Sequence, residues 1–256
     1  MMLTDPTPDA PVPEKPYLSV IIPAYNEQSR IADSLYVIKE YLSRQSYRSE
    51  IIVVDDGSND MTTEIVKFID IYGKEQLEHA EGTLIENNKN VGKGYSIAKG
   101  MLRASGDIVL FMDADHSTHI CEVEKLFPYF DLGFDVAIGS RNMKTSIVEK
   151  KPWYRNLMSQ LFNLAARLIS VSGIRDTQCG FKAYRRDVAH SIVNQQRIYG
   201  FGFDVEHLYI AQKLGFKIKE VAIEWTHSEG SKVHPVWDSM AMFFDLVRIR
   251  WFHRAL

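Results

Sequence analysis

Along the first half of the chain, short continuous apolar runs alternate with segments whose apolar residues recur every three or four positions. The runs, which are typical of buried strands, are YLSVIIP (17–23), EIIVVDD (50–56), GTLIEN (82–87) and DIVLFMDAD (107–115). Between the first two lies a predicted amphipathic helix over 29–43, for which Ser29 is the expected N-cap. Apolar strands that alternate with such helices predict an α/β fold with a doubly wound, mostly parallel sheet.

The second half of the chain has a less regular pattern. Further predicted strands are DVAIGSR (135–141), DTQCGFKAYRRD (176–187) and KIKEVAIEWTH (217–227), and further predicted helices cover 153–171 and 204–215. No internal repeat and no linker divides the chain, so one domain is expected over 17–235. Residues 1–16 contain five prolines and are expected to form a disordered leader. Residues 236–256 are expected to form an amphipathic C-terminal helix.

Asp113 and Asp115, with Ala114 between them, end the fourth apolar run. Residues two positions apart in a strand project from the same face, so an extended chain would present both carboxylates together where the strand meets solvent. Paired carboxylates suit Mg²⁺ or Mn²⁺, which also hold substrate phosphates. A D-x-D sequence alone also occurs by chance in loops, but its place after a buried strand favours a metal site.

Two other predicted strands also have unusually polar carboxyl ends. They are followed by Tyr25, Asn26 and Glu27, and by Asp55, Asp56, Gly57 and Ser58. Ligands of parallel α/β sheets bind outside the carboxyl ends of the strands. The polar groups that gather at this edge therefore predict a binding site there.

Two stretches, one over 55–58 and the other NVGKG (90–94), allow two interpretations each. Asp55 or Asp56 could accept from a nucleobase N–H or a ribose hydroxyl with Ser58 nearby, or the stretch could be an Asx-type turn capped by Ser58 and Asp60. In NVGKG, Lys93 and the backbone beside it could approach a nucleotide at a helix N-terminus, or the glycines could serve only a tight turn.

Composition narrows the class of protein. The 256 residues are 45% hydrophobic, enough for a substantial core, and a net charge of −3 argues against a general nucleic-acid surface. The two cysteines have neither disulfide nor zinc spacing, which favours a reducing compartment. No apolar run approaches the length of a spanning helix. We therefore expect a soluble or peripheral protein on the cytoplasmic face of a membrane.

Taken together and in this order, the motifs resemble those of family 2 glycosyltransferases with the GT-A fold. The stretches that carry the resemblance are VIIPAYNE, IIVVDDGSND, NKNVGKG, DIVLFMDAD, GSR and DTQCGFKAYRR. Within that family the chain is most similar to dolichyl- and polyprenyl-phosphate hexosyltransferases, and FGFDVEHLYIAQKLG and EWTHSEGSKV look more like the glucosyl than the mannosyl branch. The resemblance covers about residues 17–233.

The resemblance implies a role for each matching residue. The residues implied in nucleotide-sugar binding are Pro23, Tyr25, Glu27, Asp55, Asp56, Ser58, Lys93, Asp113, Ala114 and Lys232. Asp113 and Asp115 would hold the metal, and Asp115, Arg141, Arg155 and Asp176 would be catalytic. In this scheme the two arginines neutralise phosphate oxygens, Asp176 lies at the sugar or the metal, and Lys232 closes over the diphosphate. The chain departs from the mannosyl branch at Ser117, where glutamine is common.

The function that the resemblance implies is an inverting, Mg²⁺- or Mn²⁺-dependent transfer of a hexose, preferably glucose from UDP-glucose, to a polyprenyl or dolichyl phosphate. An acceptor phosphate is largely a dianion near neutral pH, since its second pKa is roughly 6, so the reaction needs no general base. The alternatives are a mannosyltransferase that uses GDP-mannose and a family 2 enzyme that acts on a glycan acceptor. A sugar-nucleotide-binding module without activity is the remaining alternative.

The end of the chain offers a contact with the lipid. Its apolar residues Met240, Phe243, Phe244, Val247 and Trp251 recur at helical spacing among Arg248, Arg250 and Arg254. A basic, aromatic, amphipathic helix of this kind suits a membrane interface. The alternative is a helix packed on the core or on a second subunit, as in a homodimer.

Asp204 and Glu206 also allow two interpretations. They could contact sugar hydroxyls, or they could only cap the helix that follows.

Overall fold

The computed structural model describes residues 15–72, 80–148, 162–167, 169–226 and 237–256. The strands are β1 (Leu18–Ala24), β2 (Ser49–Asp55), β3 (Ala80–Glu86), β4 (Ile108–Met112), β5 (Val136–Ser140), β6 (Ile147–Val148), β7 (Phe181–Arg185), β8 (Ile218–Ala222) and β9 (Glu224–Trp225). The helices are α1 (Ile31–Ser43), α2 (Thr62–Tyr72), α3 (Lys93–Arg103), α4 (Phe127–Asp131), α6 (Arg186–Val193), α7 (Phe203–Lys213) and α8 (Trp237–Phe252), with a 3₁₀ helix η2 (Ile120–Lys125). Residues 162–167 are also helical.

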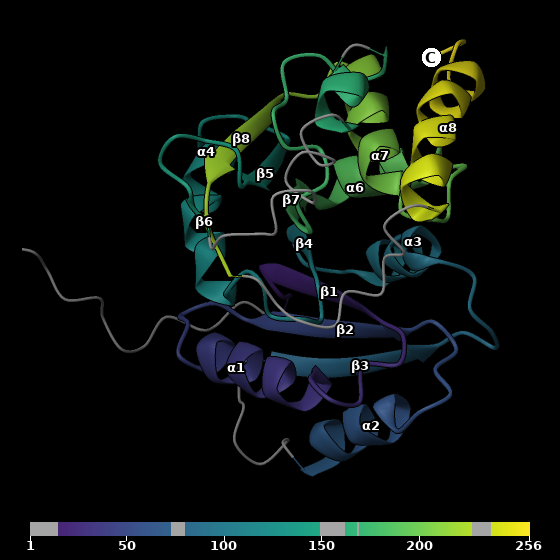
Figure 1. Cartoon of the computed structure of the whole chain (residues 1–256). Coiled ribbons are helices and arrows are strands. Elements are labelled where there is room, and N and C mark those ends of the chain that lie inside the picture. Colours follow the sequence, from purple (N-terminus) through teal and green to yellow (C-terminus); the bar gives the residue numbers. More distant parts are fainter. Residues whose placement is uncertain (1–14, 73–79, 149–161, 168, 227–236) are drawn as a thin grey trace, which may run out of the picture.

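A seven-stranded sheet in the order β3-β2-β1-β4-β7-β5-β8 forms the centre of the molecule (Figure 1). All neighbours are parallel except β7, which runs antiparallel to both β4 and β5. The predicted doubly wound, mostly parallel sheet is thus confirmed. The strand order reverses between β1 and β4, and in such sheets the crevice at this reversal is where ligands bind.

Helices cover both faces of the sheet because its strands are apolar on both sides. In β1, Ile21 packs into one core with α3, α6, α7 and α8, whereas Val20 and Ile22 pack into the other with α1, α2, η2 and α4 (Figure 1). This arrangement explains why the strands read as continuous apolar runs rather than alternating ones. Burial on both faces also keeps the site at the strand ends on a rigid base.

Three local expectations differ from the structure. α1 begins after Arg30 and not after a Ser29 cap, because the carbonyl of Glu27 already accepts from the N–H of Arg30 at 3.0 Å and of Ile31 at 2.9 Å. The last predicted strand is two strands, β8 and β9, with Ile223 between them. The predicted strand ending at Asp115 stops at Met112, and a turn follows it.

α8 packs on the core along one side only. Met242, Leu246 and Ile249 belong to the core that α3, α6 and α7 share. On its other side α8 exposes the apolar residues Met240, Phe243, Phe244, Val247 and Trp251. Among the described residues, no helix combines the length and the apolar character that crossing a bilayer requires.

Candidate functional site

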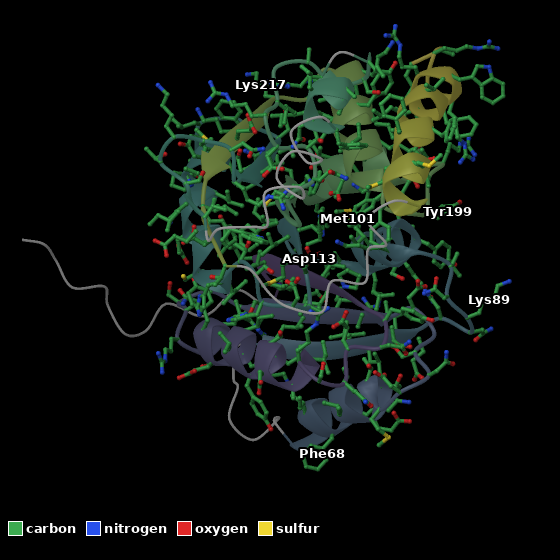
Figure 2. The ribbon with its side chains drawn as sticks, viewed as in Figure 1. Phe68, Lys89, Met101, Asp113, Tyr199 and Lys217 are labelled. Atoms are coloured by element: carbon green, nitrogen blue, oxygen red, sulfur yellow. The ribbon has the colours of Figure 1, made fainter. Side chains whose placement is uncertain are left out.

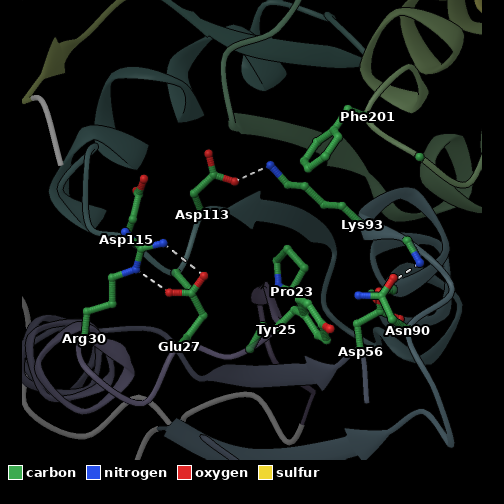
Figure 3. Close-up of a pocket in the computed structure, with 15 residues that line it drawn as sticks. Pro23, Tyr25, Glu27, Arg30, Asp56, Asn90, Lys93, Asp113, Asp115 and Phe201 are labelled. Atoms are coloured by element: carbon green, nitrogen blue, oxygen red, sulfur yellow. Dashed lines mark hydrogen bonds and ion pairs between the residues drawn. The ribbon is translucent and has the colours of Figure 1, made fainter. Parts of the chain in front are cut away.

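A cavity of about 420 Å³ opens at the carboxyl ends of β1 and β4, where the strand order reverses (Figure 3). The described residues that line it are Pro23, Ala24, Tyr25, Glu27, Arg30, Asp56, Asn90, Gly92, Lys93, Ser96, Asp113, Ala114, Asp115, Gly200 and Phe201. Eight of the fourteen predicted site residues are among them: Pro23, Tyr25, Glu27, Asp56, Lys93, Asp113, Ala114 and Asp115. The topology thus brings together polar groups from segments far apart in the sequence.

Asp113 and Asp115 both line the cavity, but a turn and not a continued strand presents them. Residues 114 and 115 form the turn, and His116 after it has a left-handed φ of 60°. The hydroxyl of Ser34 on α1 donates to the Ala114 carbonyl at 2.7 Å, which fixes the turn against that helix. Asp115 also accepts from the N–H of Ser117 at 3.0 Å. The prediction that the chain stays extended through Asp115 is therefore wrong.

Lys93, the first residue of α3, extends across the cavity toward Asp113 (Figure 3). Its Nζ donates to Asp113 Oδ1 at 2.5 Å. Burial by itself lowers the pKa of the Lys93 ammonium, but the negative charges of Asp113 and then Asp204 outweigh it and raise that pKa. Lys93 therefore stays charged near neutral pH. On the other side of Asp113, a Cβ at Gly180 would lie 2.0 Å from Oδ2, so only glycine leaves room for this carboxylate.

Asp56 lines the cavity while holding the loop that precedes α3. Its Oδ1 accepts from Asn87 Nδ2 at 2.9 Å and from the N–H of Val91 at 3.0 Å, and its Oδ2 accepts from the N–H of Gly92 at 2.8 Å. Gly92 has a φ of 122°, and a Cβ there would lie 2.4 Å from the carbonyl oxygen of Tyr199. The glycine is therefore needed for the turn and also lines the cavity, so the two interpretations of this stretch are compatible.

Asp55 and Ser58 form an Asx-type turn behind the cavity. Asp55 Oδ2 accepts from the N–H groups of Gly57 at 3.1 Å and Ser58 at 3.0 Å, and Asp55 Oδ1 accepts from the Ser58 hydroxyl at 2.5 Å. The Ser58 hydroxyl in turn accepts from the N–H of Asn26 at 2.8 Å, which ties β2 to the end of β1. Of the two interpretations offered for Asp55, the structure shows the turn. Neither residue is among those that line the cavity.

Arg30 is a cavity residue that the sequence did not single out. Its guanidinium Nη2 donates to Glu27 Oε1 at 3.0 Å, and its Nε pairs with the other oxygen of the same carboxylate (Figure 3). The hydrogen bond that Arg30 donates to Glu27 raises the pKa of Arg30, burial opposes this, and the charges of Glu27, Asp115 and Asp113 add to the increase. A second permanent cation therefore lies on the Asp115 side of the cavity, opposite Lys93.

Arg141 and Asp176 pair with each other near the end of β5. Arg141 donates from Nε to Oδ2 at 2.7 Å and from Nη2 to Oδ1 at 2.8 Å, and its backbone N–H donates to Oδ2 at 2.9 Å. Burial alone would raise the pKa of Asp176, but the charge and hydrogen bonds of Arg141 lower it to about 2. Neither residue is among the described residues that line the cavity.

The carboxylates of Asp204 and Glu206 on α7 are buried, and neither is among the residues that line the cavity. Asp204 pairs with Lys182 of β7, whose Nζ also donates to the Cys179 carbonyl at 2.7 Å. Glu206 accepts from two backbone N–H groups before α7 and from His253 after α8. Both carboxylates thus have partners within the protein and neither of them caps α7, while the alternative contact with sugar hydroxyls stays a prediction.

Two predicted site residues, Arg155 and Lys232, lie outside the described residues, as do residues 1–14 of the leader predicted over 1–16.

The sequence of the protein matches a known family. Residues 19–193 fit the family model described as Glycosyl transferase family 2. The chain is 36% identical over 247 residues to a Dictyostelium discoideum protein named dolichyl-phosphate beta-glucosyltransferase, with 92% of this chain and 74% of that protein covered. The human protein of the same name is 35% identical over 246 residues, covering 91% of this chain and 74% of its own length. The chain belongs to glycosyl transferase family 2.

Solved structures relate the fold of this family 2 glycosyltransferase to known enzymes. The glucosyl-3-phosphoglycerate synthase of Mycobacterium tuberculosis, crystallised with Mn²⁺, UDP and glucosyl-3-phosphoglycerate, aligns with a TM-score of 0.67 at 19% identity. The alignment covers 91% of this chain and 78% of that chain. At this level of identity the likeness concerns the fold, and it confirms the expected GT-A architecture.

The acidic residues of this family 2 glycosyltransferase suit a divalent ion for which the protein supplies only some of the ligands. Within the described residues, no three His, Cys, Asp or Glu side chains converge on one point as a complete metal cage. Asp113 and Asp115 instead offer carboxylate oxygens to an open cavity, the donor type that Mg²⁺ and Mn²⁺ prefer. Lys93 already places one positive charge on Asp113. The residues therefore fit an ion that substrate phosphates and water help to coordinate.

The cavity also contains residues that sequence reasoning missed. Arg30, Asn90, Ser96, Gly200 and Phe201 line it without having been predicted. Arg30 precedes a helix, and Gly200 and Phe201 lie between α6 and α7. A polar or aromatic residue in such a position has no periodicity that distinguishes it from an ordinary loop residue. Asn90 begins the NVGKG stretch and Ser96 follows it by two positions, and this stretch was the one signal that could have indicated them.

Proposed function

We propose that this family 2 glycosyltransferase transfers glucose from UDP-glucose to a dolichyl or other polyprenyl phosphate and inverts the anomeric carbon. The observation that carries the proposal is the cavity at the switch point, where Asp113 and Asp115 face the cations of Lys93 and Arg30. Relatives named dolichyl-phosphate beta-glucosyltransferase from Dictyostelium discoideum and Saccharomyces cerevisiae, both 36% identical, support the acceptor and the sugar.

The donor diphosphate is the group that this charge pattern suits. Asp113 and Asp115 would hold a Mg²⁺ or Mn²⁺ ion, which when bound neutralises the diphosphate and stabilises the charge that develops as the nucleoside diphosphate departs. A solved structural neighbour that contains both Mn²⁺ and UDP-glucose is consistent with such an ion. Lys93 would exchange its hydrogen bond with Asp113 for one with a phosphate oxygen. Asp56 keeps the loop before α3 in place for the nucleoside.

The acceptor needs positioning more than activation. A polyprenyl phosphate has a second pKa of roughly 6, so near neutral pH it is largely a dianion and its oxygen is already nucleophilic. The protein therefore needs cations that orient the phosphate on the side of the sugar opposite the leaving diphosphate. Arg141 is the candidate among the described residues, because Asp176 occupies only its Nε and Nη2. Attack from that side gives a β-linked product from an α-linked donor.

We also propose that the protein reaches its lipid substrate through the outer side of α8, on the cytoplasmic face of a membrane. That side exposes Phe243, Phe244, Val247 and Trp251 with Arg250 among them. Aromatic and aliphatic side chains beside arginines favour the interface of a bilayer that contains anionic lipids. A lipid surface is therefore the occupant that this face suits, and a second copy of the chain is the outcome that would contradict it.

The test is a transfer assay with detergent-dispersed polyprenyl phosphate and a panel of UDP-glucose, UDP-galactose, UDP-N-acetylglucosamine and GDP-mannose. We expect a glucolipid from UDP-glucose in Mg²⁺ or Mn²⁺, its loss in excess EDTA, and its recovery when metal is restored. The anomeric configuration of the product, read by NMR coupling constants, should be β. Preference for GDP-mannose would contradict the proposed donor, and transfer only to a glycan would contradict the proposed acceptor.

Two single substitutions after β4 form a matched pair of test and control. Asp115→Asn should abolish transfer, because it removes a carboxylate charge from the cavity while keeping the shape of the side chain. Asp131→Asn changes an exposed carboxylate at the end of α4 and should leave transfer unchanged. A fully active Asp115→Asn enzyme would overturn the proposed metal site.

A further inference from the structure

The wall of the cavity nearest Lys93 comes from a segment that joins α6 to α7. We call residues 196–202 the wall segment. Its residues Gly200 and Phe201 line the cavity, and Figure 3 shows the Phe201 ring beside Lys93. Residues 196–199 form neither helix nor strand, so no regular ladder of backbone hydrogen bonds fixes their position; the local bond among them runs from the N–H of Gln196 to the Val193 carbonyl at 3.1 Å. Other groups must hold the wall segment in place.

One set of contacts joins the wall segment to the start of α3. Gln196 Nε2 donates to the Gly94 carbonyl at 3.0 Å, and the N–H of Tyr95 donates to the Tyr199 carbonyl at 3.3 Å. The rings of Tyr95 and Tyr199 also pack edge to face, with centroids 5.5 Å apart. The wall segment and the first turn of α3, which carries Lys93, therefore move together.

A second set of contacts comes from the far side of the wall segment and is fully buried. Glu206 accepts from the N–H of Arg197 at 2.9 Å through Oε1 and from the N–H of Ile198 at 2.9 Å through Oε2. His253 Nε2 lies 2.8 Å from the same Oε1. Glu206 is 0% exposed and His253 is 3% exposed. This carboxylate thus connects the wall segment to the residue that follows α8.

α8 also touches the wall segment directly, at Gly202. A Cβ at this glycine would lie 2.5 Å from Asp245 Oδ2, so α8 packs closely against the end of the wall segment. Asp245 lies on α8 and His253 directly after it; the N–H of His253 still donates to the Ile249 carbonyl at 3.1 Å, so the helical path continues, and eight residues at 3.6 per turn place the two residues about 80° apart around it. This side of the C-terminal helical segment therefore contacts the end of the wall segment directly, at Gly202. It contacts the beginning of the wall segment indirectly, through Glu206.

We propose that Glu206 and His253 are positioning residues for the donor site, although neither lines the cavity. Glu206 fixes the backbone of Arg197 and Ile198, and His253 keeps its carboxylate in the orientation that serves both N–H groups. Without the imidazole, Glu206 Oε1 keeps only one hydrogen-bond donor, the N–H of Arg197, in a place that water does not reach. The buried carboxylate is then under-solvated, and rotating away from the two N–H groups toward another donor or solvent lowers its free energy. The wall segment then loses its fixed distance from Lys93 and Asp113. This inference rests on the proposed function, because it assumes that the cavity binds the nucleotide.

The variants that test the inference are His253→Ala, His253→Gln and Glu206→Gln. The amide of His253→Gln can still donate to Glu206, so it should restore what His253→Ala loses. His190→Ala is the matched control: this imidazole also makes one hydrogen bond through Nε2, 3.0 Å from the Met101 carbonyl, but at the opposite end of α3 from the cavity. A merely structural role predicts a lower melting temperature for both alanine variants without a selective effect on the nucleotide.

Two measurements on the full chain decide the question. Hydrogen exchange followed by mass spectrometry should show faster exchange in peptides that cover 196–202 and 92–96 in His253→Ala, and unchanged exchange there in His190→Ala. Calorimetric titration with UDP in Mn²⁺ should show about a tenfold weaker affinity in His253→Ala, the effect of one lost hydrogen bond. His253→Gln should recover most of both effects.

Faster exchange confined to residues 250–256 in His253→Ala, or an unchanged affinity for UDP, would overturn the positioning role. Failure of the proposed function gives a different result. If the unmodified protein binds neither UDP nor GDP, the donor assignment is wrong, while the exchange of 92–96 still reports whether His253 acts on the start of α3. Unchanged exchange at 92–96 would then overturn the inference independently.

Discussion

Arg141 and Asp176 form a buried bidentate ion pair, with Nε–Oδ2 and Nη2–Oδ1 distances of 2.7 and 2.8 Å. Arg141 directly follows β5 and Asp176 precedes β7, and the resemblance assigned each of them separately to the substrate or the metal. In the structure each is the other's principal partner, and Glu220 Oε1 accepts from the N–H of Asp176 at 2.9 Å. The pair therefore fixes the direction of the Arg141 guanidinium, as its proposed contact with the acceptor phosphate requires. A cation held in one direction loses less conformational freedom on binding than a mobile one.

Asp176→Asn should destabilise the protein strongly. Removing one partner of a buried pair leaves an uncompensated charge, which typically costs about 3–5 kcal/mol. Because the pKa of Asp176 is depressed to about 2, the stabilisation is fully present above the ordinary carboxyl pKa and is lost as the pH falls through 2. Urea denaturation at pH 7 and at pH 3 checks both points. The difference between the two proteins should be smaller at the lower pH.

A second carboxylate provides the comparison. Asp131→Asn alters an exposed residue and should change the free energy of unfolding by less than about 0.5 kcal/mol. An Asp176→Asn variant as stable as the unmodified protein would contradict the energetic role of the pair.

Lys93→Met should weaken binding of the donor nucleotide. The substitution removes a charged donor from the cavity while keeping a chain of similar length, and a hydrogen bond to a charged group contributes about 1.5–3 kcal/mol. We therefore expect roughly a tenfold to hundredfold rise in the Kd for UDP in Mn²⁺, measured by calorimetry. The charge of Lys93 also repels a metal ion, so Mn²⁺ alone should bind Lys93→Met more tightly.

Lys99→Met is the matched control on the same helix. Lys99 Nζ donates to Asn87 Oδ1 at 2.8 Å, and the residue is not among those that line the cavity. Equal losses of UDP affinity in the two variants would mean that Lys93 acts through the general charge of α3 and not through contact with the diphosphate.

The sequence predicted the fold and the edge that carries the site because both depend on local patterns. Apolar runs gave the strands, and β1, β2 and β4 all end in polar residues at one edge of the sheet. The sequence did not predict which polar residue faces the cavity. Asp55 and Asp56 differ by one position, and only the direction of the chain after β2 separates the turn residue from the cavity residue.

Other parts of the site depend on long-range packing that a local pattern does not contain. The end of β4 at Met112 is fixed by the hydrogen bond from Ser34, 80 residues earlier in the chain, to Ala114. Phe201 lies at the cavity in a segment that Gln196 joins to α3 and Glu206 joins to α7. α8 packs on the core, which is one of the alternatives offered for the C-terminal helix, and it still exposes an apolar side, so its contact with a membrane stays a prediction.

His207 should make the protein less stable as the pH falls below about 6.5. It is fully buried on α7, with Nε2 2.8 Å from Gln196 Oε1, and no partner for Nδ1 is found in the described part of the chain. Burial, with a smaller effect of the Lys182 charge, lowers the pKa of His207 to about 3. Between about pH 6.5 and 3 the unfolded chain binds a proton that the folded chain does not, so its share of the free energy of unfolding falls by up to about 1.4 kcal/mol per pH unit.

His207→Gln tests this directly, because the amide can still donate to Gln196 and does not titrate. Denaturation at pH 7.5, 6.0 and 5.0 should show a smaller decrease of stability with falling pH in His207→Gln than in the unmodified protein. Parallel pH dependences would mean that folding does not lower the pKa of His207.

The outer side of α8 gives the last prediction. Phe244 and Trp251 are 63% and 62% exposed, and replacing both with serine should remove most of the affinity for vesicles that contain phosphatidylglycerol. Burying one aromatic side chain contributes about 1.5–3 kcal/mol, so the pair should change vesicle binding by at least about a hundredfold. Co-sedimentation at low and high salt measures this, and the arginines predict weaker binding at high salt.

Phe68→Ser is the control, since Phe68 is 57% exposed on α2, far from α8 across the molecule (Figure 2). It should leave vesicle binding unchanged, because the membrane proposal concerns α8 alone. If the double variant binds vesicles normally but light scattering shows that it has become smaller in solution, α8 covers a second copy of the chain and not a membrane. Loss of vesicle binding without a change in mass supports the lipid surface, since only a bilayer then explains why those two aromatic residues face outward.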